Sequence, residues 1–220
     1  GALYRCAHIR REGLTMEKFT TLTAVAAPMD RPNIDTDQLL PARFLRRPRD
    51  EGFGDVLFID QRFDDDGNPR PDFVLNQAPY KEARIIVGDR NFGGGSSREG
   101  APWALLDYGF RCIVASSFGD IFYNNSLKNG LLPVRLAEDA VTAIRKQLHD
   151  NPGSTITVDL EAQTVTAPDG ASHSFDIEPF RKQSLLKGLD DIGMTQEHDQ
   201  EIDTFEKGFR QRRPWLFADA

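Results

Sequence analysis

The sequence predicts an α/β fold in which a core of parallel strands is extended by a small β-meander. Buried-strand runs alternate with helical patterns over residues 83–149, which is the βαβ order of a parallel sheet. Short strands separated by turns follow over residues 155–176. The 220 residues include 39% hydrophobic and 28% charged side chains, a composition typical of one domain with a sizeable core.

The amino-terminal third is expected to hold one strand and a long polar loop. Residues 20–27 alternate Thr with Ala, Leu and Val and stop at Pro28, which indicates a strand. Residues 33–37 contain Asn and Asp at every second position and predict a turn region. Residues 43–72 are rich in Arg, Asp, Gly and Pro, and we expect a loop around one short element at residues 56–59. Long loops inside compact domains tend to be functional.

From residue 83 onward, strands and helices alternate. A strand over residues 83–88 leads into a glycine-rich segment and then a helical pattern that ends at Gly109, a natural helix stop. The next segments are predicted as strand, helix, strand and helix, in this order: residues 112–115, 120–128, 131–136 and 138–149. The meander strands and the two final helices are predicted at residues 155–160, 164–167, 172–176, 178–188 and 195–209.

We expect residues 1–15 to form a tail and residues 16–220 to form a single domain. The first fifteen residues contain three arginines but no apolar run long enough for a signal peptide. The longest apolar stretches elsewhere are far shorter than the ~20 residues that span a bilayer. A cytoplasmic protein without a membrane segment is therefore expected.

Charge and cysteine content exclude further classes. The 27 Lys and Arg against 34 Asp and Glu give a formal charge of -7, and no long basic run is present, so nucleic-acid binding is not expected. Cys6 and Cys112 are the two cysteines; they lie far apart and outside any CxxC pattern. This indicates a reducing compartment and predicts no metal cluster held by this chain alone.

The glycine-rich segment over residues 89–100 is the candidate anion site. Where a strand turns into a helix, backbone N–H groups and the positive end of the helix dipole converge on one place. Three known glycine-rich motifs do not match the letters. A P-loop would need Lys where Ala101 stands, while a dinucleotide fingerprint and a hydrolase elbow would each need Gly where Arg98 stands.

Ser96 has two interpretations. It opens a Ser-x-x-Glu capping box, but a helix starting there would place Pro102 beyond the first turn, where its ring clashes with the Arg98 carbonyl. We therefore expect the helix to begin nearer Gly100 and residues 96–98 to face the anion. Arg98 could be a surface salt-bridge residue, but the small residues beside it favour carboxylate binding.

Three segments resemble the small subunits of 3-isopropylmalate dehydratases (LeuD), in the aconitase superfamily. They are residues 91–105 (NFGGGSSREGAPWAL), 33–38 (NIDTDQ) and 117–122 (SFGDIF), and the resemblance runs from about Met16 to the end. It implies a swivelling β/β/α domain of the kind found at the carboxyl end of aconitase. It also implies a hydro-lyase that interconverts 2-isopropylmalate and 3-isopropylmalate by dehydration and rehydration in leucine biosynthesis.

The resemblance further implies a large, LeuC-like partner subunit that carries a [4Fe–4S] cluster, with no cofactor bound by this chain. The iron would act as a Lewis acid on the leaving hydroxyl. The cysteine count agrees, because two separated thiols cannot hold such a cluster. The substrate would be a small hydroxy diacid.

Carried over by motif position, the resemblance implies a role for six residues. Ser96 would be the catalytic base, and Ser97 and Arg98 would bind a substrate carboxylate beside Gly95. A serine hydroxyl is a weak acid, so its anion needs backbone N–H donors, a helix terminus and a cation nearby. Asp37 would lie in the active site, whereas Asp35 fits better as a turn former.

The sixth residue, Arg43, would be a second carboxylate ligand. Phe44 and Leu45 beside it would form an apolar wall for an isopropyl group, or would simply pack the loop. Gly94 and Gly100 depart from the family, which usually has Cys and His at these positions. Two alternatives therefore stay open: a related hydro-lyase for another 2-hydroxy diacid, such as 2-methylmalate or a dimethylmalate, and a non-catalytic anion- or RNA-binding module.

Overall fold

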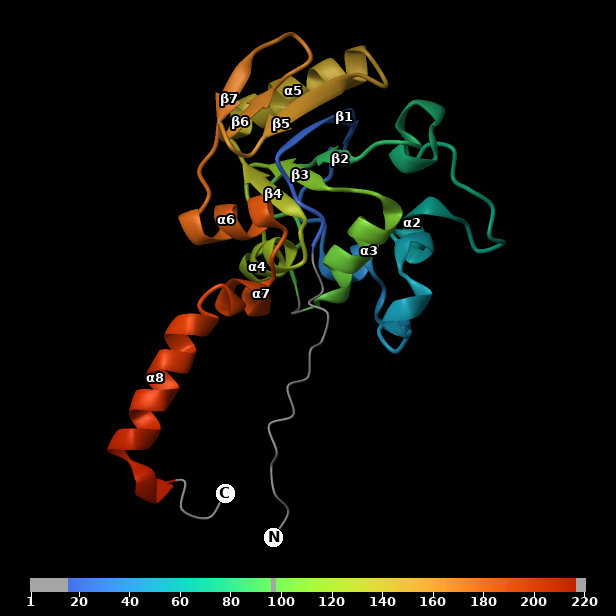
Figure 1. Cartoon of the computed structure of the whole chain (residues 1–220). Coiled ribbons are helices and arrows are strands. Elements are labelled where there is room, and N and C mark those ends of the chain that lie inside the picture. The colour runs from blue at the N-terminus through green and yellow to red at the C-terminus, as the bar shows by residue number, and fades with distance from the viewer. Residues whose placement is uncertain (1–15, 96–97, 217–220) are drawn as a thin grey trace.

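A computed structural model describes residues 16–95 and 98–216 and contains one seven-stranded mixed sheet (Figure 1). The strand order is β4-β3-β2-β1-β5-β6-β7. The first four strands are parallel and the last three form an antiparallel meander. The strands are β1 Thr21–Pro28, β2 Ile85–Val87, β3 Cys112–Ala115, β4 Leu132–Arg135, β5 Thr155–Asp159, β6 Thr164–Thr166 and β7 Ser172–Ser174.

Strand β1 joins the two halves of the sheet. Its residues 21–25 pair antiparallel with β5, while its residues 26–28 pair parallel with β2. The burial follows this division, because Thr21 and Thr23 are exposed whereas Ala26 and Ala27 are fully buried. One long strand therefore carries both the meander and the parallel core.

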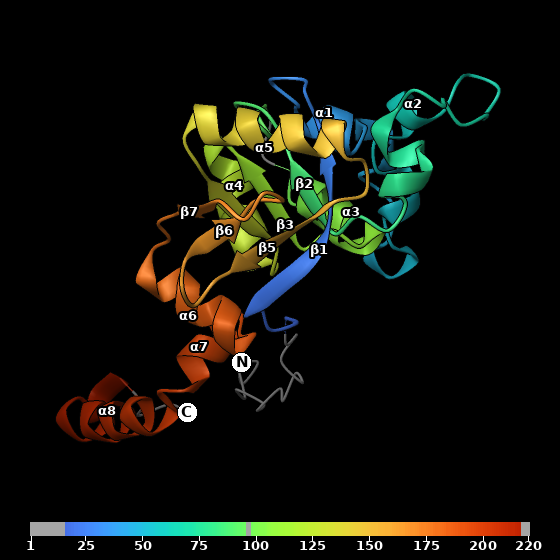
Figure 2. The ribbon, with the colours of Figure 1, turned by 90° about the horizontal axis from the view of Figure 1, so that it is seen from above.

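Helices cover both faces of the parallel half, as Figure 2 shows with α5 and α3 on opposite sides. Successive residues of β2 point to different clusters: Ile86 packs with α3 residues, and Ile85 and Val87 pack with α5 residues. A strand buried on both faces explains the continuous apolar run in the sequence. The helices are α1 Thr36–Leu39, α2 Ile59–Arg62, α3 Gly100–Tyr108, α4 Asp120–Lys128, α5 Glu138–Asp150, α6 Pro179–Lys187, α7 Asp191–Gln196 and α8 Asp199–Arg212.

The parallel core and the meander are confirmed, but two expectations need correction. The predicted loop over residues 43–72 is a packed layer of short helical turns, in which Phe53, Val56, Leu57 and Phe58 are buried. The apolar residues of this layer lie in several short turns and do not follow one helical or strand period. No regular hydrophobic pattern in the sequence therefore predicted them. The helix expected over residues 195–209 is instead two helices, α7 and α8.

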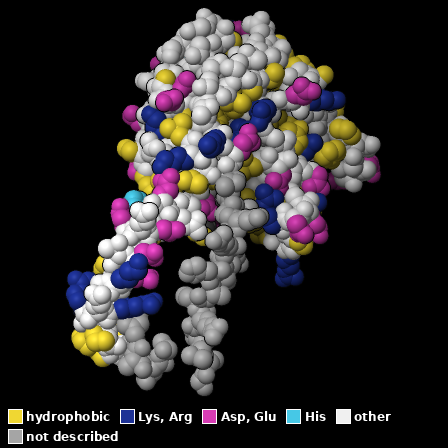
Figure 3. Space-filling model, in the orientation of Figure 1, with side chains coloured by type: hydrophobic (Ala, Val, Ile, Leu, Met, Phe, Trp, Pro, Cys, Tyr) yellow, Lys and Arg dark blue, Asp and Glu magenta, His cyan; other side chains and the backbone are white. Residues whose placement is uncertain are grey.

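Helix α8 extends away from the sheet, as Figures 1 and 2 show, and it has no buried residue. Figure 3 shows apolar and basic side chains near its far end. Phe205, Trp215 and Leu216 are among the exposed apolar side chains of this region. Within the described part of the chain, no helix is long and apolar enough to cross a membrane.

An ion pair fastens the end of β2 to α5. Asp89 follows β2, and its carboxylate accepts a 2.8 Å hydrogen bond from Arg145, which also donates to the Met29 carbonyl at 3.3 Å. Burial raises the pKa of Asp89, but hydrogen bonds from the Arg90 N–H and the Arg145 guanidinium outweigh it, so the net pKa is below the ordinary 3.8. The carboxylate form thus stabilises the fold.

We predict that Asp89→Asn lowers the free energy of unfolding by about 2 kcal/mol at pH 6, because Arg145 loses its charged partner. A depressed native pKa gives stability that is complete above the ordinary value of 3.8 and is lost as the pH falls below it. The deficit of the variant should therefore shrink at pH 3 in urea unfolding. Exposed Asp65→Asn is the control, and an equal deficit at both pH values would contradict the assignment.

Candidate active site

Three loops meet at the carboxyl ends of β1, β2 and β3. The loop after β1 forms a parallel bridge with the glycine turn at Asp35 and Gly94, and the turn forms another with the loop after β3 at Phe92 and Phe118. The N–H of Thr36 donates to the Gly94 carbonyl at 3.0 Å. Ligand sites of open α/β sheets lie at this edge. The three segments that carry the family resemblance are thus brought together.

Glycine makes the close approach of these loops possible. Gly93 has φ +72°, and a Cβ there would lie 2.1 Å from the Phe122 ring. A Cβ on Gly119 would lie 2.6 Å from the Gly93 carbonyl oxygen. Gly95 has φ +94° and faces Asp35. No larger residue fits at Gly93 without moving α4.

Two asparagines support the same turn, and the sequence analysis did not single them out. Asn33 and Asn91 have φ 58° and 55°, a region that asparagine tolerates better than most residues. The Asn91 side-chain amide donates to the Asn33 side-chain oxygen at 2.9 Å. Asn91 stands two residues before Gly93. Its place at the beginning of the glycine-rich segment was the feature of the sequence that could have identified it as part of the turn.

Asp35 is the N-cap of the short helix α1. Its carboxylate accepts from the Gln38 N–H at 2.8 Å, and the Gln38 side chain accepts from the Asp35 N–H at 3.3 Å, which completes a capping box. This confirms Asp35 as a turn former. Asp37 lies in the first turn of α1 with its side chain 56% exposed.

Arg98 and Asp37 form an ion pair although they are 61 residues apart in the sequence. The Arg98 side chain is only 16% exposed, whereas the Asp37 carboxylate is open to solvent. A guanidinium carries five N–H donors, and Asp37 is the one acceptor of the Arg98 side chain among the described residues. The remaining donors can take a second carboxylate. Ser96 and Ser97 lie outside the described residues.

Helix α3 begins at Gly100, which confirms the start expected from Pro102. Its first turn contains Pro102, where the missing N–H costs nothing. The Glu99 carboxylate instead accepts from the Asn129 side chain at 3.2 Å, and Asn129 accepts from the Trp103 indole N–H at 2.8 Å. These contacts tie the start of α3 to the end of α4. They therefore hold in place the backbone directly after Arg98.

Arg43 lies in a different contact from Arg98. It donates to Asp60 at 2.8 Å, and its guanidinium lies 4.7 Å from the centre of the Phe44 ring. The hydrogen bond to Asp60 raises the pKa of Arg43, and the same bond lowers the pKa of Asp60. Both side chains are more than half exposed, so Arg43 stays accessible. Its role as a second carboxylate ligand remains a prediction.

The apolar wall expected at residues 44–45 divides into two parts. Phe44 packs against the core, which fits the simple packing interpretation. Leu45 is 46% exposed and lies 3.9 Å from where a Cβ on Gly100 would stand. A Cβ there would also lie 2.6 Å from Leu40, a fully buried side chain. Leu40 therefore occupies the space that a side chain at position 100 would need.

Gly94 is the other departure from the family pattern. A Cβ at Gly94 would lie 3.0 Å from the Asn91 amide, so a side chain there requires a small shift. The Asn91 side chain is held by Asn33, and the two asparagines occupy the surroundings of this glycine.

The described residues contain no group of three or more His, Cys, Asp or Glu side chains that could hold a metal ion. Cys112 is fully buried in β3, and burial raises the pKa of its thiol far above the usual range. A thiol in this environment is unsuited to bind a metal as thiolate. Cys6 lies outside the described residues.

Comparisons with known proteins agree with this geometry. A family model described as "Aconitase C-terminal domain" matches residues 16–139, and one described as "LeuD_N" matches 142–179. A third, for the C-terminal domain of the 3-isopropylmalate dehydratase small subunit, matches 191–219. A 3-isopropylmalate dehydratase small subunit from Roseobacter denitrificans is 53% identical over 201 residues, covering 91% of this chain and 100% of the relative. One from Gluconobacter oxydans is also 53% identical over 201 residues, covering 91% and 96%.

A solved structure is similar in fold. The crystal structure of 3-isopropylmalate dehydratase (leuD) from Methanocaldococcus jannaschii matches with a TM-score of 0.61 and 20% identity, covering 84% of this chain and 98% of that chain. The α/β fold of the aconitase C-terminal domain type, expected from the sequence, is confirmed.

We predict that Gly93→Ala destabilises the protein by about 3 kcal/mol or more, because it combines a disfavoured φ with a clash against Phe122. Gly67→Ala is the matched control, since Gly67 has φ +83° with nothing within 4 Å of its Cβ position. Gly67→Ala should lower the free energy of unfolding only by the backbone strain, which is about 1 kcal/mol. Thermal and urea unfolding of both variants measure the difference, and equal losses would show that the contact with Phe122 is unimportant.

Proposed function

Because the chain belongs to the family of 3-isopropylmalate dehydratase small subunits, we propose that it supplies the carboxylate-binding and proton-transfer side of a two-subunit hydro-lyase active site. The observation that carries this proposal is the pairing of Arg98 with Asp37 beside the glycine turn, at the beginning of α3. The reaction is the interconversion of 2-isopropylmalate and 3-isopropylmalate.

Arg98 binds a carboxylate of the substrate in this proposal. A guanidinium matches a carboxylate with two parallel N–H donors, and its low exposure reduces competition from water. Asp37 holds the guanidinium in place before substrate arrives, which lowers the entropy lost on binding. The substrate carboxylate and Asp37 can share the N–H donors of Arg98, because among the described residues only one of these donors is used, by Asp37.

Ser96 exchanges the proton in this proposal. The base takes a proton from one carbon while the hydroxyl leaves the neighbouring carbon as hydroxide, and an alkene results; the proton on Ser96 and the hydroxide together amount to one water. Water then adds back in the opposite orientation, which moves the hydroxyl by one carbon. The serine anion would be stabilised by the neighbouring Arg98 cation and by the start of α3.

We propose that the [4Fe–4S] cluster belongs to a large partner subunit. The described residues of this chain do not fit such a group, since Cys112 is buried and no metal-binding group of side chains is formed. The relatives' designation as small subunits implies a large partner. A cytoplasmic location of the complex remains our expectation.

We propose that Leu45 contributes to the selection of the substrate's alkyl group. It is the exposed apolar residue next to the start of α3, so it can contact an isopropyl group of a substrate bound at Arg98. A smaller alkyl group would bury less apolar area against Leu45. This favours isopropylmalate over 2-methylmalate, by about 0.8 kcal/mol for each buried CH₂.

We predict that the purified chain alone has no hydro-lyase activity and no iron–sulfur absorbance, and that activity appears when cluster-loaded large subunit is added. Alkene formation followed in the ultraviolet measures turnover. Isopropylmalates, 2-methylmalate and a dimethylmalate are compared as substrates. Activity of the chain alone would end the two-subunit proposal, and a preference for 2-methylmalate would favour the alternative hydro-lyase.

We further predict that Ser96→Ala and Arg98→Lys affect the reconstituted complex differently. Removal of the base should lower kcat by several orders of magnitude with little change in KM. Arg98→Lys keeps the charge but loses the planar two-point grip, so it should raise KM as well as lower kcat. Steady-state kinetics with 3-isopropylmalate separate the two effects.

The controls are Ser174→Ala, at an exposed serine of β7, and Arg46→Lys, at an exposed arginine of the loop after η1 (Ala42–Phe44). Both should leave the kinetics unchanged. If Ser96 were only a helix cap, its alanine variant would lose about 1 kcal/mol of stability and keep most activity. A thermal melt beside the kinetics distinguishes these outcomes.

A further inference from the structure

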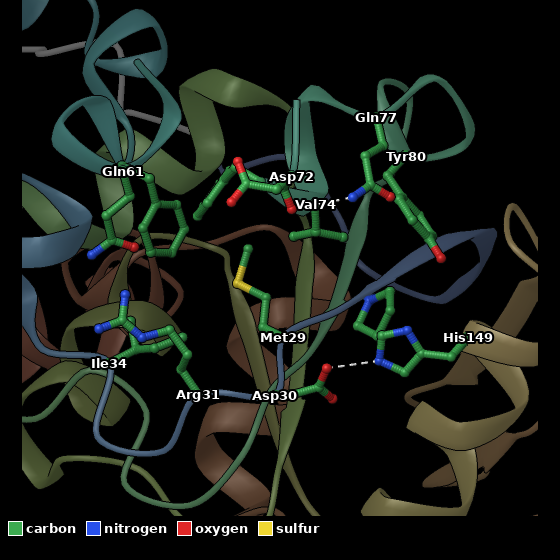
Figure 4. Close-up of a pocket in the computed structure, with 13 residues that line it drawn as sticks. Met29, Asp30, Arg31, Ile34, Gln61, Asp72, Val74, Gln77, Tyr80 and His149 are labelled. Atoms are coloured by element: carbon green, nitrogen blue, oxygen red, sulfur yellow. Dashed lines mark hydrogen bonds and ion pairs between the residues drawn. The ribbon is translucent and has the colours of Figure 1, made fainter. Parts of the chain in front are cut away.

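A second cavity lies between the loop after β1, residues 58–80 and the end of α5 (Figure 4). Its volume is about 270 Å³, and neither Asp37 nor Arg98 lines it. Pockets for drug-sized ligands start at about 300 Å³, so this cavity suits a smaller ligand, such as one of amino-acid size.

The floor of this cavity is apolar. Met29, Ile34 and Phe58 line it and are almost completely buried, and Val74 lines it from the opposite segment. Figure 4 shows Met29 and Val74 between the polar side chains. An apolar group of a ligand would thus leave water for a surface of buried apolar side chains, which favours its binding.

The rim carries two charges without partners. Arg31 and Asp72 are exposed lining residues, and neither side chain has a hydrogen-bond or ion-pair partner among the described residues. The other charges at the rim are satisfied, because Asp30 contacts His149 at 2.8 Å and also lies 3.7 Å from Arg145. Figure 4 shows Arg31 and Asp72 entering the cavity from different segments.

One positive and one negative group above an apolar floor match a zwitterion with an apolar tail. A simple carboxylic acid would leave Asp72 unpaired, and a dicarboxylate would be repelled by both Asp72 and Asp30. We propose that the cavity binds a small apolar α-amino acid. Its carboxylate pairs with Arg31, its ammonium group pairs with Asp72, and its side chain rests on Met29 and Ile34.

The test is titration calorimetry of the full chain with three matched probes. L-norleucine carries both charges, hexanoate lacks the ammonium group, and pentylamine lacks the carboxylate. L-norvaline and L-phenylalanine extend the panel in tail size. At least one of the three amino acids should bind at least tenfold more tightly than either single-charge probe.

Variants assign the two charges. Arg31→Gln and Asp72→Asn should each weaken amino-acid binding about tenfold or more. Arg46→Gln and Asp65→Asn change exposed residues that do not line the cavity, and they should leave binding unchanged. All four positions are exposed, so the variants should fold, which a thermal melt checks.

Three results would overturn the proposal. The first is that none of the three amino acids binds at millimolar concentration. The second is that hexanoate or pentylamine binds as tightly as the tightest-binding amino acid, which would make the site one for ligands with a single charge. The third is that Arg31→Gln or Asp72→Asn leaves amino-acid affinity unaltered.

Discussion

The close approach of the glycine turn to the start of α4 is the constraint on which the site depends. Gly93 and Gly119 lie so near each other that a Cβ on either would overlap the opposite segment. This contact allows the bridges that join the turn to the loops after β1 and β3. Without it, Asp37 and Arg98 would not be brought into contact. Glycine here serves geometry rather than flexibility.

The sheet supplies the rigid frame for these loops. Its parallel strands are buried on both faces, and β1 connects them with the meander. Loops that carry chemistry can then vary in sequence while their ends stay fixed. The contacts of Asn129 with Glu99 and Trp103 extend this frame to the start of α3. Arg98 therefore lies directly before a helix start that is held in place.

Arginine–carboxylate pairs organise the surface around the site. Arg43 contacts Asp60, Arg47 contacts Asp55, and Arg49 contacts Asp107 through two hydrogen bonds of 2.7 and 2.9 Å. The pair of Arg49 with Asp107 holds residues 43–60 against α3, and the other two pairs join parts of this segment to one another. Each is partly exposed and individually weak, but together they reduce the freedom of the segment beside Arg98. Asp55, Asp60 and Asp107 thus have local structural partners.

The sequence by itself determined the parallel core, the meander and the beginning of α3. Continuous apolar runs identify strands buried on both faces, and Pro102 confines the first turn of its helix. Only the tertiary structure decided the packing of residues 43–72, the pairing of Arg98 with Asp37 and the second cavity. The physical reason is the separation of the contacting residues along the chain. A local hydrophobic pattern shows the period of one helix or strand, whereas these features join segments that are tens of residues apart, and no local period encodes such contacts.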